Sequence, residues 1–256
     1  MNRYVILLSV FLLSFFTSCE KVIDLDLNTS SSQIVIEGNV YDEAGPYTVK
    51  ISRSVNIDEP SVYPAVTGAT VSISDNAGNA EVLAEKASGV YQTSTSQGVP
   101  GRTYTLSVEV EGQKYTAIST MPEGVEIDTL FTVETGYPGF HQISVDLTDP
   151  ANTVNYYRLV DWVNGKRLET IIVANDELSK GKKINGTLMY SEDDMKSGDT
   201  YTLWLESIDK GVYDYFNSAS LNGQDSASPS NPVSNISNGA LGYFNACSVR
   251  KKSIVI

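Results

Sequence analysis

The sequence predicts a mainly β protein. An N-terminal immunoglobulin-like or transthyretin-like sandwich is expected, followed by a second, mostly β domain with one short helix. Three observations predict this class. Short stretches of alternating apolar and polar residues recur at spacings of roughly ten residues. Turn-forming Gly, Pro, Asn and Asp residues separate them. Helical periodicity is clear in a single stretch.

The first domain is expected over residues 33–121. Each of its segments alternates as a half-buried strand does, and Glu111-Gly112 predicts a two-residue hairpin between the last two. Met121-Pro122-Glu123-Gly124 marks the end of the domain, because Pro and Gly together terminate a strand. The expected strands are 33–41, 47–52, 69–74, 80–84, 89–93, 102–110 and 113–120.

The second domain is expected over residues 126–256. Asn164-Gly165 is the strongest hairpin signal and places Trp162 opposite Arg167. Asn185-Gly186 is expected to separate further strands. Asp209 is the expected N-cap of the helix, which would end at Asn222-Gly223. The expected strands are 127–135, 141–148, 156–163, 166–173, 201–206, 240–246 and 252–256.

Residues 1–18 have the pattern of a signal peptide. Arg3 precedes an apolar run over residues 4–16, and small residues lead directly to Cys19. We therefore expect a bacterial lipoprotein signal, with Cys19 as the lipidation site and residues 19–32 as a lipid-anchored tether. Phe16 departs from the stricter form of the motif, and an ordinary signal peptide with a chance cysteine is the alternative.

The composition argues against several classes of function. The formal net charge is −13, so nucleic acid is not an expected partner. One histidine argues against a zinc site and a histidine-based triad. With Cys19 lipidated, Cys247 has no disulfide partner and is expected to be a small buried residue. There is neither a Gly-x-Ser-x-Gly elbow nor a glycine-rich phosphate loop. We expect no catalytic residues, no metal and no cofactor.

Two features keep alternatives open. Glu192, Asp193 and Asp194, near Asp199, could hold calcium weakly or form a solvated turn. Residues 222–239 form a long loop in which Asp225 is the only charged residue. That loop is either pinned across its own domain or docks a partner. The candidate docking residues are Asn231, Val233, Asn235, Ile236 and Asn238.

Five short segments are specific in combination: residues 19–25, 45–49, 68–71, 98–104 and 238–244. Together they resemble a lipoprotein family of Bacteroidetes-type bacteria, the domain of unknown function 4249. Residues 100–108 are also similar to the carboxypeptidase-regulatory-like sandwich domains attached to TonB-dependent receptors. The resemblance implies an outer-membrane, surface-facing protein that works near such receptors. The family offers no agreed catalytic or ligand residues to carry over.

These expectations favour a binding or accessory role beside a TonB-dependent nutrient transporter. The expected partners are the membrane, through the N-terminal lipid, and the receptor itself. A surface glycan or peptide hydrolase is the alternative from another class, and a structural or adhesion subunit is a third.

We predict that Cys19 carries the lipid. Mass spectrometry of the N-terminus extracted from membranes should find acylated Cys19 as the first residue, because the apolar run and small residues before it fit lipoprotein processing. Another mature N-terminus, or a Cys19→Ser chain that stays in the membrane fraction, would contradict this.

Overall fold

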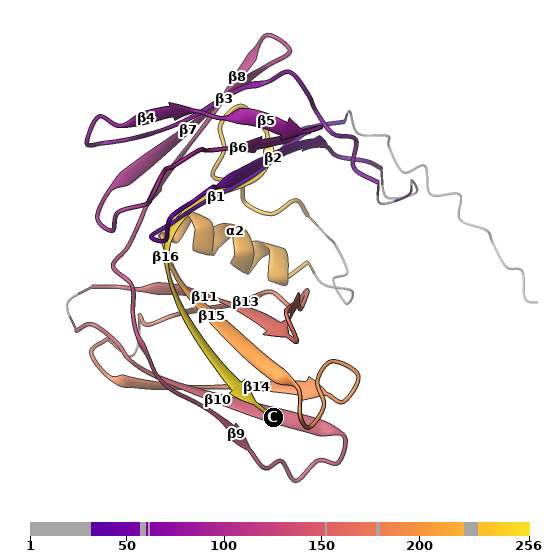
Figure 1. Ribbon diagram of the computed structural model, residues 1–256, viewed down its shortest axis with the longest axis vertical. Helices are drawn as coiled ribbons and strands as arrows, with labels where there is room; N and C mark the ends of the chain where they lie inside the picture. The colour runs from indigo at the N-terminus through magenta and orange to yellow at the C-terminus, as the bar shows by residue number, and fades with distance from the viewer. Residues whose placement is uncertain (1–31, 57–59, 61, 152, 178–179, 223–229) are drawn as a thin grey trace, which may run out of the picture. The chain divides into compact units, whose positions relative to one another are not determined.

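The computed structural model describes residues 32–56, 60, 62–151, 153–177, 180–222 and 230–256. The predicted leader, Cys19 and all of the tether before residue 32 lie outside the described residues. Within these ranges the chain is mostly β with one helix, which confirms the predicted fold class (Figure 1). The described part contains no helix that is both long and apolar enough to cross a membrane.

The N-terminal strands form two facing sheets, as a sandwich requires. Residues that alternate inward from both sheets, such as Ile36, Val49, Leu106 and Val108, are buried in one hydrophobic cluster. One sheet includes β1 (Ile34–Tyr41), β2 (Thr48–Arg53), β6 (Val90–Gln92) and β5 (Ala84–Ala87). The other has the order β4 (Ala80–Val82), β3 (Thr70–Asp75), β7 (Thr103–Val110) and β8 (Gln113–Thr120).

The later strands repeat this arrangement around a second cluster, which includes Ile143, Tyr201 and Leu203. A three-stranded sheet has the order β14 (Lys183–Ser191), β10 (Phe140–Thr148) and β9 (Ile127–Val133). The other sheet includes β11 (Tyr156–Val163), β12 (Lys166–Arg167), β13 (Ile172–Asn175) and β15 (Thr200–Ile208).

A single strand, β16 (Leu241–Val255), belongs to both parts. It pairs in parallel with β1 and antiparallel with β15, giving the order β12-β11-β15-β16-β1-β2-β6-β5, with β13 beside β11. The sequence predicted two closing strands, 240–246 and 252–256. They are one strand because the residues between them also pair: Cys247 pairs with β1, and residues 248–251 pair with β15.

Some residues of the second expected domain, 126–256, pack in the core of the first. Residues Ile236, Ala240, Phe244 and Ala246 pack in the first cluster, with residues from 34 to 121, although they follow the second group of strands in the chain. Contacts join Ser32–Ile256 into one unit.

Helix α2 (Lys210–Ser220) lies against β11, β13 and β16 (Figure 1). The predicted N-cap is confirmed, because the Asp209 side chain accepts a hydrogen bond from the Val212 N–H at 2.9 Å. The helix buries Val212 and Phe216. Beneath it, Arg158 and Glu206 form a buried ion pair at 3.1 Å, and the Arg158 guanidinium lies 3.8 Å from the centre of the Phe216 ring.

The two Asn-Gly pairs behave differently. Asn164-Gly165 forms the predicted turn, with φ of 50° and 79°, and Trp162 does pair with Arg167. The ring of Trp162 packs against Trp204, with centroids 5.1 Å apart. Asn185-Gly186, by contrast, lies inside β14, so its prediction as a break was wrong. An added Cβ at Gly186 would meet Val145 at 3.1 Å, so the glycine fits the sheet pairing.

The second arm of the Asn164-Gly165 hairpin is shorter than predicted. A strand was expected over residues 166–173, but β12 ends at Arg167 and pairing resumes in β13. β5 is an additional strand that the sequence did not indicate.

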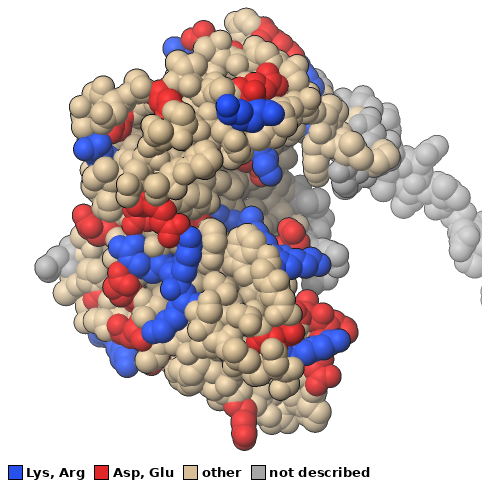
Figure 2. Space-filling view, in the orientation of Figure 1, with Lys and Arg blue, Asp and Glu red and all other residues tan. Residues whose placement is uncertain are grey.

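Charged groups of both signs share the surface. Figure 2 shows basic side chains bordered by acidic ones on the face in view. Arg250 is part of such a pattern, because its Nη1 lies 2.8 Å from Asp42 Oδ2 and its Nε 2.5 Å from Glu126 Oε1. Lys251 pairs with Glu43 and lies 4.0 Å from the centre of the Trp204 ring.

A buried carboxylate connects the two sheets of the second cluster. Asp161 on β11 accepts hydrogen bonds from the hydroxyls of Tyr190 on β14, at 2.7 Å, and Tyr201 on β15, at 2.6 Å. All three side chains are buried. Burial raises the pKa of Asp161, while the two hydroxyls oppose that shift.

We predict that Tyr201→Phe lowers the free energy of unfolding by about 1.5–3 kcal/mol, because it removes a hydrogen bond to a buried acidic group. Chemical denaturation measures the change. Tyr137→Phe is the control, since Tyr137 is 67% exposed and should change stability by less than about 0.5 kcal/mol. Equal effects of the two variants would contradict a structural role for the Asp161 contacts.

The described end of the long loop, residues 230–239, is fastened to neighbouring strands. The Asn235 side chain bonds both main-chain groups of Phe244, at 3.0 Å to the N–H and 2.8 Å to the carbonyl. Ile236 is buried in the first cluster. The Ser237 N–H donates to the Thr116 carbonyl at 2.8 Å.

We predict that Asn235→Ala destabilises the fold by about 1–3 kcal/mol, because it leaves main-chain groups of the buried Phe244 without partners. Asn231→Ala is the matched control, since Asn231 is exposed and should be close to neutral. Thermal melts of both variants provide the comparison. An unchanged melting temperature for Asn235→Ala would show that this contact does not hold the loop.

Candidate functional site

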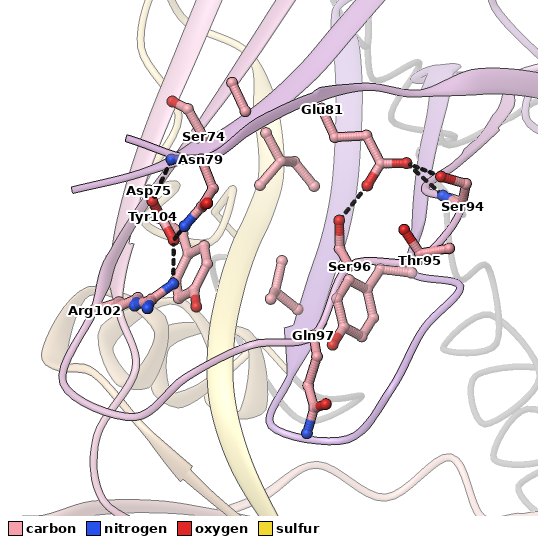
Figure 3. Close-up of a pocket in the computed structure, with 14 residues that line it drawn as sticks. Ser74, Asp75, Asn79, Glu81, Ser94, Thr95, Ser96, Gln97, Arg102 and Tyr104 are labelled. Atoms are coloured by element: carbon pink, nitrogen blue, oxygen red, sulfur yellow. Dashed lines mark hydrogen bonds and ion pairs between the residues drawn. The ribbon is translucent and has the colours of Figure 1, made fainter. Parts of the chain in front are cut away.

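A cleft of about 490 Å³ opens in the N-terminal sandwich (Figure 3). Its volume falls within the ~300–1,000 Å³ of small-molecule sites. The β3–β4 hairpin forms one side, and the segment after β6 forms the other. The lining residues are Val40, Tyr47, Ile73, Ser74, Asp75, Asn79, Ala80, Glu81, Ser94, Thr95, Ser96, Gln97, Arg102 and Tyr104.

Asp75 organises the hairpin side. Its Oδ1 accepts hydrogen bonds from the N–H groups of Ala77 and Asn79, at 3.0 and 2.9 Å. Its Oδ2 accepts from the Asn79 amide and from Arg102 Nη1, both at 2.8 Å. Partial burial alone would raise the pKa of Asp75, but these hydrogen bonds outweigh it and lower the pKa to about 2. The carboxylate is therefore charged and already occupied by donors.

Glu81, on β4, joins the hairpin to the opposite side. One carboxylate oxygen accepts hydrogen bonds from the N–H and the hydroxyl of Ser94, at 2.5 and 2.7 Å, and the other accepts from the Ser96 hydroxyl. Burial would raise the pKa of Glu81, but the serine hydrogen bonds lower it overall. In Figure 3 the Asp75–Arg102 group and the Glu81–serine group face one another across the hollow.

Tyr47 and Gly98 fix the segment between Ser94 and Gly98. The Tyr47 hydroxyl accepts a hydrogen bond from the Gly98 N–H at 2.9 Å and donates to the Tyr41 carbonyl at 2.7 Å. Gly98 is required here, because an added Cβ would lie 2.4 Å from that carbonyl oxygen. Tyr104 closes the base by accepting from the Val99 N–H at 2.7 Å.

Several polar groups of the cleft remain available. The hydroxyls of Ser74 and Thr95 have no side-chain hydrogen bond among the described residues, and Thr95 is exposed. Gln97 donates through its amide nitrogen to the Asp42 carbonyl at 2.9 Å, which leaves its amide oxygen open. Arg102 uses Nη1 for Asp75 and is 34% exposed, so its remaining donors can reach a ligand.

The two carboxyls of the cleft do not suit two-carboxyl glycoside hydrolysis. Glycoside hydrolysis by two carboxyls needs one that keeps its proton near neutral pH, which requires a raised pKa. Asp75 and Glu81 both have lowered pKa values, so neither is suited to act as the acid.

The residues predicted from the sequence lie elsewhere. Cys19 is outside the described residues. In the loop, Asn235 bonds to Phe244 of β16, Ile236 is buried in the first cluster, and the Asn238 amide donates to the Lys114 carbonyl at 2.5 Å. The loop, which follows the strands of the second domain, is therefore fastened to the first domain. Asn231 and Val233 are exposed. None of these five residues lines the cleft.

The acidic run beyond β14 is divided between two turns. Asp194 accepts a hydrogen bond from the Ser191 hydroxyl at 2.8 Å, whereas Asp199 accepts from the Asn164 amide and the Lys196 N–H, both at 2.8 Å. No group of three or more His, Cys, Asp or Glu residues in the described ranges is placed to hold a metal ion. Cys247 is a buried free thiol.

The structure pairs the expected strands 69–74 and 80–84 as a hairpin, but no prediction from the sequence had indicated the cleft. Its polar groups come from separate segments that the sheet pairing brings together. The available signal was the run Ser94-Thr95-Ser96-Gln97, four polar residues after a short strand, which is also typical of a plain loop.

Comparisons with solved structures give remote likenesses. A DUF4785 family protein from Legionella pneumophila is 14% identical with a TM-score of 0.24, and the match covers 69% of this chain and 50% of that one. An alpha-2-macroglobulin from Salmonella is 11% identical with a TM-score of 0.22, and the match covers 88% of this chain and 15% of that one. The chain thus spans half or less of each.

No curated protein matches the sequence. A family model described as "Domain of unknown function (DUF4249)" matches residues 20–253, which is nearly the whole chain after Cys19. The chain therefore belongs to the DUF4249 family, a domain of unknown function.

Proposed function

We propose that this protein is an outer-membrane lipoprotein, anchored through Cys19 and facing the cell surface, that binds a ligand beside a TonB-dependent nutrient transporter. The observation that carries the binding role is the cleft between the β3–β4 hairpin and residues 94–97. It combines two carboxylates already paired with donors, a set of available neutral polar groups and a volume suited to a small ligand.

The sequence supports the anchoring part of the proposal. An apolar run and small residues precede Cys19. The family match begins at residue 20, directly after that cysteine, so the family region and the expected mature chain coincide. The residues that line the cleft, between Val40 and Tyr104, fall within this family region.

The exposed part of the long loop supports a contact with a receptor. Val233 is 61% exposed, and Asn231 is exposed beside it. Their neighbours Asn235 and Ile236 are fastened to the sandwich, so the exposed pair is presented from a fixed base. An exposed apolar side chain on a fixed backbone loses little conformational entropy when a partner covers it.

The hydrolase and the structural subunit remain the rival functions. The lowered pKa values of Asp75 and Glu81 weigh against acid–base hydrolysis in the cleft. An assembly subunit would require stable contacts between copies of the chain, so its signature would be self-association of the purified protein.

The test is co-purification of the full, lipidated chain from detergent-solubilised outer membranes, with quantitative mass spectrometry. A TonB-dependent receptor should be enriched, and Val233→Glu should reduce its recovery by about tenfold, because a charge would be buried at the contact. Val62→Glu is the control, since Val62 is 74% exposed and lies elsewhere in the chain. Turnover of glycan or peptide panels would favour the hydrolase, and stable self-assembly without a receptor would favour the structural subunit.

A further inference from the structure

We propose that the cleft binds a neutral sugar, as the end unit or units of an oligosaccharide. This rests on the proposed binding function and names the class of ligand for the same site. The geometry points to it through three features of the cleft: its charge state, its available hydrogen-bonding groups and its apolar lining.

The charged groups of the cleft are compensated from within. Asp75 Oδ2 lies 2.8 Å from Arg102 Nη1, and Glu81 accepts three hydrogen bonds from Ser94 and Ser96. An anionic ligand would meet two carboxylates. A cationic ligand would compete with donors that are already in place. A neutral ligand avoids both costs, because it requires neither carboxylate to give up its partners.

The groups that remain available match hydroxyls. Thr95 and Ser74 offer hydroxyls, Gln97 offers an amide oxygen, and Arg102 offers its remaining N–H donors. A sugar hydroxyl both donates and accepts, so one ligand group can satisfy a donor and an acceptor of the protein at once. These groups come from both sides of the cleft, as Figure 3 shows for Thr95, Gln97 and Arg102.

Apolar side chains also border the hollow. Val40, Tyr47 and Ile73 are buried side chains that border the hollow, and Ala80 is exposed within it. A pyranose ring presents C–H groups on its faces and hydroxyls around its rim. Apolar lining with a few convergent polar groups at its edges is the usual composition of a small-ligand site.

The cleft is also preorganised. Asp75 holds the hairpin turn through two main-chain N–H groups, and Glu81 and Tyr47 hold the opposite segment. Few side chains therefore have to be ordered when a ligand enters, which reduces the entropy cost of binding.

The test uses the full, lipidated chain in a detergent without a sugar headgroup. Maltose, cellobiose and lactose are the neutral probes, and galacturonic acid and glucosamine are the charged ones. Saturation-transfer NMR and calorimetry should detect a neutral disaccharide, with affinity weakened by about tenfold or more in Ala80→Trp. That side chain would occupy the hollow from an exposed position, so the fold should tolerate it.

Matched variants locate the site. Ala80→Ser should bind as the unaltered chain does. Thr95→Ala combined with Gln97→Ala should weaken binding by about tenfold, whereas Gln113→Ala with Thr132→Ala, at exposed positions outside the cleft, should not. Circular dichroism confirms that each variant is folded.

Three outcomes would overturn the proposal: no neutral probe binds, the charged probes bind better, or binding is unchanged in Ala80→Trp. Each can be told apart from failure of the proposed function. Co-purification of a TonB-dependent receptor would still stand if sugars fail, in which case the ligand class is wrong. Sugar binding without a receptor would retain the site and reject the transporter partnership.

Discussion

The pairing of β16 on both of its edges is the constraint on which the rest of the structure depends. Over residues 241–247 the strand lies parallel to β1, and over residues 248–255 it pairs with β15. The parallel register requires a residue without a side chain at Gly242, where an added Cβ would lie 2.0 Å from the Ile36 carbonyl oxygen. The position of β1 in turn determines where Tyr41 and Tyr47 hold the segment that borders the cleft.

Buried polar groups give the second half its geometry. Asp161 needs hydroxyls from two strands in different sheets, so its desolvation cost is offset only when β14 faces β11 and β15 in one arrangement. The Arg158–Glu206 pair beneath α2 has the same property, because removal of either partner would leave an uncompensated buried charge. Hydrophobic side chains fill the space between the sheets of the second half. The buried polar groups determine how those sheets are aligned.

Much of the fold could be predicted because its signals are local. Alternation located most strands, Asn164-Gly165 defined a turn with positive φ, and Asp209 defined the helix start. The errors concern tertiary pairing. Residues 248–251 include three polar residues and lack a clear strand pattern, and Asn185-Gly186 resembles a turn, yet neighbouring strands hold both in sheets. The cleft was missed for a related reason, since Arg102 and residues 94–97 reach the β3–β4 hairpin only when separate strands assemble.

The remote partner of β1 also constrains how the chain reaches this fold. Asn39 and Asn245, which face one another across the parallel pair, are 206 residues apart. As the chain is synthesised, β1 and β2 can pair early, but the other edge of β1 stays open until residues 241–247 appear. Such non-local pairing slows folding and leaves a sheet edge free to join other chains. The N-terminal sandwich, cleft included, is therefore completed by the C-terminal strand, and a chain truncated before residue 241 would expose this edge permanently.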